Sequence, residues 1–211
     1  MTDGAAVVAA AIAQEPVAFL PCCVILAIVG VVLVLIPIGM YNSLVRGRNH
    51  VKESWSGIDT ELKRRYDLVP NLVEAVRGYA RHEREVLERV VEARSRAVAS
   101  TGSPAAQARD ENVLVGAIRR LFALAEGYPD LKASRHFLEL QRQLVETEDR
   151  IQAARRFYNA NVRDYNNRCQ MFPTNLMAGL FRFEPAEFFE IEEAVQRLAP
   201  KVDLGGGPSH S

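Results

Sequence analysis

The hydrophobic pattern is dominated by an uncharged run of twenty-four residues near the N-terminus, from Val17 to Met40. Most of its residues are Val, Ile, Leu or Ala, and every helical face is apolar. About twenty such residues allow a helix to cross the hydrocarbon of a bilayer, whereas an isolated helix of a soluble protein keeps a polar stripe. The pattern therefore predicts one transmembrane helix at 17–40, preceded by a short N-terminal tail at 1–16.

Beyond this run, apolar residues recur at spacings of three and four, which is the period of amphipathic helices. Gly, Pro and Asp residues divide the pattern into four predicted helices. The predicted helices run from the membrane to about Arg65, from Asp67 to Ser100, from Pro104 to Gly127 and from Asp130 to Pro173. The first of them can continue the transmembrane helix without a break. The predicted N-caps of the second, third and fourth helices are Asp67, Ser103 and Asp130, and Pro70 lies in the first turn of the second helix.

The fourth predicted helix carries a coiled-coil-like seam, in which apolar residues step by threes and fours from Phe137 to Cys169. On the third, we expect Val113, Ala117, Leu121 and Leu124 to face inward. Amphipathic helices joined by short turns pack most simply as an up-down bundle. We therefore predict an all-α fold: a single N-terminal transmembrane helix followed by an antiparallel, elongated four-helix bundle over residues 41–204.

The sequence changes character after Pro173, where aromatic residues mix with Gly and Pro. We expect this stretch to cap one end of the bundle, and the alternative is an exposed patch that recruits a partner. The candidate cap residues are Phe181, Phe183, Phe188 and Phe189. The last residues, 205–211, contain too few apolar groups to fold and are predicted to be a disordered tail.

The overall charge does not indicate a class of partner, because 26 basic and 26 acidic side chains give a formal net charge of zero. A neutral chain argues against nucleic-acid binding. The local charges around the apolar run are more informative. The charged side chains before the run are Asp3 and Glu15, whereas the basic residues Arg46, Arg48 and Lys52 follow it closely. A basic flank normally stays in the cytoplasm, so the N-terminus is predicted to lie outside and the bundle in the cytoplasm.

Catalytic and metal-binding motifs are missing from the sequence. Three cysteines do not make a disulfide framework, and no His follows a Glu by three residues as in di-iron bundles. The residues three positions before His50, His82 and His136 are Gly47, Tyr79 and Ala133. The sequence also lacks a phosphate-binding Gly-Lys-Ser/Thr loop and a Gly-x-Ser-x-Gly elbow. We therefore expect no enzymatic activity, no cofactor and no metal.

Polar side chains are dense in two stretches, 63–74 and 155–167. The simplest interpretation is a solvated, salt-bridged face. The alternative is that polar residues on otherwise apolar seams, such as Glu83 and Thr147, are buried and fix the helix register. The candidate structural or partner-contact residues are Arg65, Asp67, Asn71, Glu74, Glu83, Asn159, Arg163 and Asn166.

Several runs of residues are distinctive. They are Tyr41-Asn42, Arg48-Asn49, Trp55, the run from Leu62 to Glu74, Gly78-Tyr79, the run from Leu124 to Ala133, Arg156 to Asn159, Arg163 to Asn166, Phe172-Pro173 and Phe188-Phe189. Together these runs resemble the LemA family. The likeness extends over residues 41–204, and runs of this length are specific. It leaves out residues 1–40 and the Gly-rich end at 205–211.

The resemblance implies a bacterial envelope protein with one anchor in the inner membrane and a cytoplasmic four-helix bundle. It implies no activity, cofactor or catalytic residue. Members of the family are often encoded near membrane metalloproteases, and a relative is associated with magnetosome membranes. We accordingly expect a non-enzymatic scaffold or adaptor that meets the bilayer through Val17 to Met40 and binds an unidentified protein partner. The alternatives are an accessory subunit of a membrane metalloprotease or other hydrolase, and a small-ligand sensor.

Overall fold

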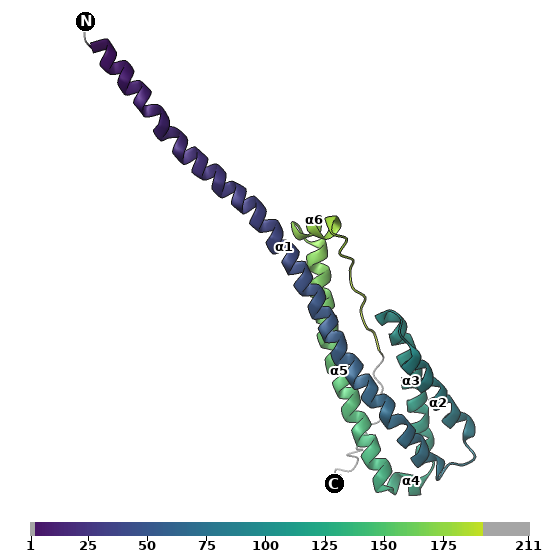
Figure 1. The fold of residues 1–211 in the computed structure, drawn as a ribbon. Coiled ribbons are helices and arrows are strands. Elements are labelled where there is room, and N and C mark those ends of the chain that lie inside the picture. The colour runs from purple at the N-terminus through teal and green to yellow at the C-terminus, as the bar shows by residue number, and fades with distance from the viewer. Residues whose placement is uncertain (1–2, 192–211) are drawn as a thin grey trace, which may run out of the picture. The chain divides into compact units, whose positions relative to one another are not determined.

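The computed structural model describes residues 3–191, which form helices, turns and one extended segment. The helices are α1 (Asp3–Arg77), α2 (Arg84–Ala99), α3 (Pro104–Ala125), α4 (Pro129–Ala133), α5 (Arg135–Gln170) and α6 (Thr174–Leu180) (Figure 1). No strand occurs between residues 3 and 191, so the predicted all-α class is confirmed. The predicted tail at 205–211 lies outside the described residues.

The described chain consists of two compact units. The first unit contains residues 3–48 and 167–184, and the second contains residues 49–166 and 185–191. Within residues 3–191, one helix is long and apolar enough to cross a membrane, and this helix is α1. The mean hydropathy of its most apolar stretch is 3.0, and none of that stretch is buried against other parts of the protein. The length and composition of this part of α1 are those of a membrane-spanning helix.

The predicted helix boundary between Arg65 and Asp67 is wrong, because α1 continues without interruption to Arg77. The chain turns instead at residues 78–83, before α2 begins. The other turns agree better with the sequence pattern. Ser103 occupies the N-cap position of α3, as expected, whereas the N-cap of α4 is Tyr128 rather than the predicted Asp130.

A contact with α2 explains why the proline at position 70 does not end α1. Proline has no N–H, so inside a helix it leaves the carbonyl oxygen four residues earlier without its usual donor. Here that oxygen belongs to Tyr66, and Nε of Arg94 donates a hydrogen bond to it at 2.6 Å. The guanidinium replaces the missing backbone donor, and the helix continues through Pro70.

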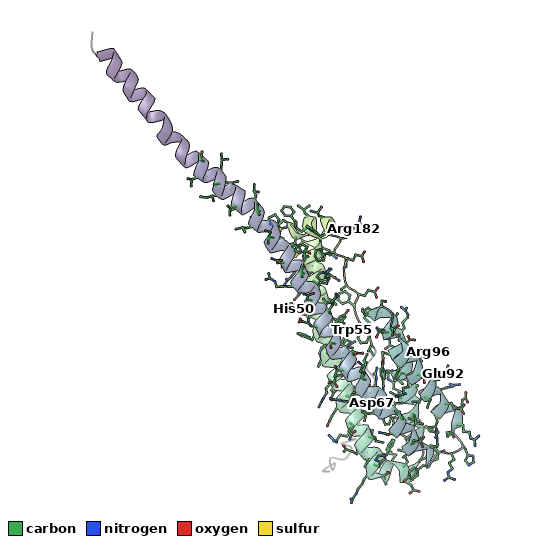
Figure 2. All side chains as sticks on the ribbon, viewed as in Figure 1. His50, Trp55, Asp67, Glu92, Arg96 and Arg182 are labelled. Carbon is green, nitrogen blue, oxygen red and sulfur yellow. The ribbon has the colours of Figure 1, made fainter. Side chains whose placement is uncertain are left out.

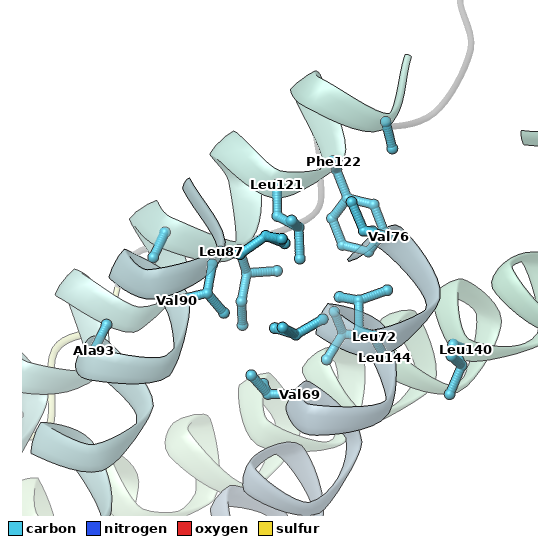
Figure 3. Close-up of a cluster of buried hydrophobic side chains, with 14 of the residues drawn as sticks. Val69, Leu72, Val76, Leu87, Val90, Ala93, Leu121, Phe122, Leu140 and Leu144 are labelled. Atoms are coloured by element: carbon cyan, nitrogen blue, oxygen red, sulfur yellow. The ribbon is translucent and has the colours of Figure 1, made fainter. Parts of the chain in front are cut away.

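The core of the second unit is a cluster of buried apolar side chains from α1, α2, α3, α4 and α5 (Figure 3). The predicted seam of α5 is buried almost throughout. The predicted inward face of α3 is right at Ala117 and Leu121 but wrong at Val113, which is 46% exposed. Leu114 lies in the core instead. Complete burial of one such side chain stabilises the fold by about 1.5–3 kcal/mol, so one shared core holds these helices together.

We predict a measurable coupling between Pro70 and Arg94. The substitution Arg94→Met should destabilise the full chain by about 1–3 kcal/mol, because the carbonyl of Tyr66 then lacks a donor. In a Pro70→Ala background this cost should shrink by about 1 kcal/mol, since alanine supplies the backbone N–H. Chemical denaturation of the four chains in detergent measures the coupling.

The control for this coupling is Arg96→Met, on the exposed side of α2. Its effect should be small and the same in both backgrounds. If Arg94→Met cost as much with alanine at position 70 as with proline, the guanidinium would not be the substitute donor.

Candidate functional site

Arg65 is fully buried, with none of its surface exposed, and it links three helices. From α1 its Nη1 donates a hydrogen bond to Oε1 of Glu148 on α5 at 2.8 Å. Its Nη2 donates to Oε2 of Glu111 on α3. Both carboxylate side chains are also buried. We call Arg65, Glu111, Glu148 and the adjoining Tyr66 the buried ion cluster.

The helical period explains why these charged side chains lie inside the second unit. Arg65 follows Leu62 by three residues and precedes Val69 by four, and both neighbours are buried. Glu111 and Glu148 each stand three residues before a fully buried apolar residue of the same helix. Side chains three or four apart share one face of a helix. Arg65 is among the candidates predicted from the sequence and the two glutamates are not, although this spacing is the signal that could have found them.

The electrostatics of the buried ion cluster keep its hydrogen bonds in place. Burial by itself would lower the pKa of Arg65, but the charges of Glu148 and Glu111 outweigh it and raise that pKa. The hydroxyl of Tyr66 donates to the second carboxylate oxygen of Glu111. Burial, followed by the charge of Glu111, raises the pKa of Tyr66, so its phenol remains a donor. The cluster is therefore built to hold helices, with its charges shielded from solvent.

A second polar network joins α5 to the extended C-terminal segment, residues 185–191. Nδ2 of Asn166 donates to the carbonyl of Ala186 at 2.9 Å, and Oδ1 accepts from the N–H of Ala186 at 2.8 Å. Asn159 makes the same pair of hydrogen bonds with the backbone of Phe189, each at 3.0 Å. Each amide side chain thus satisfies both backbone groups of one residue, as a neighbouring strand would.

Further side chains complete this network. The hydroxyl of Tyr158 donates to the carbonyl of Glu187 at 2.9 Å, and Nη1 of Arg155 donates to that of Ile191 at 2.7 Å. Burial and then Glu187 raise the pKa of Tyr158 to about 12, so the phenol stays a donor. Because these contacts are made with backbone atoms, they depend on the extended conformation of the segment more than on its side chains.

Apolar contacts anchor the same segment. The ring of Phe189 is completely buried and lies edge-on to Trp55, with the ring centroids 5.1 Å apart. Trp55 also packs against the ring of Tyr158 at 5.3 Å. Backbone hydrogen bonds and buried rings therefore fix the C-terminal segment on the second unit together.

The remaining polar candidates lie at or near the surface. Asn71 and Arg163 are exposed, and so is Asp67 (Figure 2). Glu74 is exposed beside Arg77, with 2.7 Å between its carboxylate and the guanidinium. Glu83 is half-buried at the N-cap position of α2 and makes no side-chain capping bond. The structure thus brings Arg65, Asn159 and Asn166 into internal networks and leaves the other candidates outside them.

The four candidate cap phenylalanines belong to two units. In the first unit, the rings of Phe181 and Phe183 lie 4.9 and 5.7 Å from that of Tyr41. Phe188 and Phe189 belong to the second unit, where Phe189 is buried and Phe188 is partly exposed. Phe181, Phe183 and Phe189 therefore each pack within their own unit.

Comparison with known proteins places the chain in a family. The sequence profile of the LemA family matches residues 54–204, which include the buried ion cluster and the α5 side chains that hold the C-terminal segment. The chain belongs to the LemA family. This match confirms the resemblance that the sequence runs indicated.

The LemA-family chain is also similar to individual proteins. Protein LemA of Metamycoplasma hominis is 28% identical over 159 residues, which cover 74% of this chain and 71% of that protein. The magnetosome proteins MamQ 1 and MamQ 2 of Paramagnetospirillum magneticum are each 27% identical over 179 residues, or 73% of this chain. The match covers 66% of the length of each magnetosome protein, which is just under two thirds.

We predict that Asn159→Ala or Asn166→Ala loosens the C-terminal segment. Each substitution removes two hydrogen bonds to one backbone residue, and a loss of about 1–3 kcal/mol corresponds to roughly fivefold to 150-fold faster exchange. Hydrogen exchange at the amides of Ala186 and Phe189, followed by mass spectrometry or NMR, measures this effect.

The matched control is Asn167→Ala, which changes the neighbouring, exposed asparagine of α5. Exchange in residues 185–191 should remain unchanged in that variant. Equal exchange rates in the Asn166→Ala and Asn167→Ala chains would show that the amide of Asn166 does not hold the segment.

Proposed function

We propose that this LemA-family chain is a membrane-anchored, non-enzymatic protein whose second unit serves as a scaffold or adaptor for a partner protein in the bacterial cell envelope. One observation carries the proposal. The helix that contains the exposed apolar stretch, α1, also supplies Arg65 and core residues such as Leu72 to the second unit. The lipid anchor and the folded unit thus share one secondary-structure element.

The proposed architecture is a four-helix bundle in which α1, α2, α3 and α5 alternate in direction. Their common apolar core and the short connections between successive helices support it, because short loops favour antiparallel neighbours. The coiled-coil-like seam of α5 fits the same packing. In this arrangement the outer surface of the second unit is available to bind a partner.

The proposed location is the inner membrane, with a single span at residues 17–40, the N-terminus outside and the second unit in the cytoplasm. Arg46, Arg48 and Lys52 after the span support this orientation, since basic flanks stay in the cytoplasm. The likeness to proteins named for the magnetosome is compatible with a role in assembling structures at a membrane.

The polar networks of the second unit favour a scaffold over a catalyst. The guanidinium of Arg65 is bound to two carboxylates, and the amides of Asn159 and Asn166 are bound to backbone groups. Side chains engaged in this way stabilise the fold and have few polar groups left to bind a substrate. The alternative function is that of an accessory subunit of a membrane hydrolase. Capture of such a hydrolase as the partner would identify it.

Site-specific photocrosslinking in native membranes tests the proposal. A photoreactive residue is placed at Val98 on α2 or at Phe157 on α5, both of which are exposed. A scaffold should crosslink to a defined protein from one of these faces, because a rigid interface uses one patch of surface. The same product should disappear when the chain lacks residues 1–40 and is not held at the membrane.

The control position is Leu33, inside the apolar stretch. It should crosslink to lipid and not yield the partner product. Indistinguishable products from Val98 and Phe157, or products that persist without residues 1–40, would contradict a membrane-tethered scaffold.

A further inference from the structure

The first unit exposes a second group of large apolar side chains, outside the apolar stretch of α1. These residues lie on α6 or directly beside it, and each is between 51 and 78% exposed. They are Met171, Phe172, Leu176, Leu180 and Phe181. A group of large exposed apolar side chains close together in the chain often marks a surface that is covered in the functional protein.

Two contacts place α6 beside the end of the apolar run (Figure 1). The ring of Phe181 lies 4.9 Å from that of Tyr41, which directly follows the last residue of the run. Nη1 of Arg168, near the end of α5, donates to the carbonyl and hydroxyl oxygens of Ser43 at 3.2 and 3.0 Å. Since a helix rises about 1.5 Å per residue, α6 lies within a turn or so of Met40.

The end of α6 is fixed by local hydrogen bonds. The N–H of Phe183 donates to the carbonyl of Ala178 at 2.9 Å, and the N–H of Arg182 donates to that of Gly179 at 3.4 Å. This pair of bonds is the Schellman motif, in which the residue with positive φ is usually Gly. Here it is Arg182, with φ of 52° and an exposed side chain (Figure 2).

The surroundings of α6 match the boundary between lipid headgroups and acyl chains. Aromatic and apolar side chains favour that depth, and arginines beside them extend to the phosphates. Arg48 lies over the ring of Phe183, with its guanidinium carbon 5.1 Å from the ring centroid. Arg182 adds a second cation to the same unit. Continuity with the apolar run favours lipid over a protein as the covering partner.

We propose that residues 171–181 form a second membrane contact, in which α6 lies in the plane of the bilayer boundary beside the span of α1. The cations of Arg48 and Arg182 face the lipid phosphates. This inference rests on the proposed membrane anchoring by α1, because the same bilayer covers both surfaces. The in-plane contact would hold the membrane-proximal end of α5 at the lipid surface.

Tryptophan quenching by brominated lipids tests the in-plane contact. The full chain carries Leu180→Trp or Leu176→Trp and is reconstituted into phosphatidylcholine and phosphatidylglycerol vesicles. The parent spectrum is subtracted, because Trp55 is present in every chain. Interfacial side chains lie about 5–10 Å into the headgroup and acyl boundary, so bromines near the headgroup should lower the added emission about twofold.

Two matched variants make each outcome decisive. Leu33→Trp lies in the apolar stretch and should be quenched best by bromines deep in the acyl chains, whereas Val91→Trp on α2 should not be quenched. If Leu33→Trp is quenched and both α6 variants behave like Val91→Trp, the in-plane contact is overturned and the surface is left to a protein. If Leu33→Trp is not quenched, the anchoring itself fails, and the inference with it.

Discussion

The second unit depends on a buried cation, the guanidinium of Arg65, which binds Glu148 on α5 and Glu111 on α3. A charge inside a protein is tolerated only when it is paired and hydrogen-bonded. Sliding α1 by one turn, about 5.4 Å, would separate all three charges inside the core. Buried ion pairs add little stability compared with apolar residues, but they can select one packing over others. We therefore interpret the cluster as the constraint that sets the register of α1, α3 and α5.

Polar side chains elsewhere in the second unit also act as internal connections. Tyr66 takes part in two of them, because its hydroxyl binds Glu111 and its carbonyl accepts from Arg94 of α2. Asn159 and Asn166 pair with backbone groups of the C-terminal segment, which has no neighbouring strand among residues 3–191 to do so. The same physical rule accounts for all of these contacts: a buried backbone or charged group needs a partner.

The sequence predicts the parts of this structure that follow from local periodicity. The apolar run of α1 and the α5 seam are visible as patterns, and both are present in the structure. The continuation of α1 through Pro70 is not predictable in this way, since it depends on Arg94, a residue distant in the sequence. From the sequence alone, Glu111 and Glu148 resemble surface charges. Their burial depends on Arg65, which α1 places between them in the folded unit. Asn159 and Asn166 stood out by polar density, but their backbone partners lie 30 and 20 residues away.

The most direct test of the account is the stability of the Arg65→Met chain relative to Arg64→Met, by denaturation of the full chain in detergent. Arg65→Met leaves two buried carboxylates without their cation, and we expect a loss of about 3–5 kcal/mol. Arg64 is exposed and pairs with Glu61 at 3.3 Å, so its loss should cost less than about 1 kcal/mol. Adding Glu111→Leu and Glu148→Leu to Arg65→Met should restore much of the stability. Equal, small losses for both single variants would contradict the claim that the buried cation sets the packing of the helices.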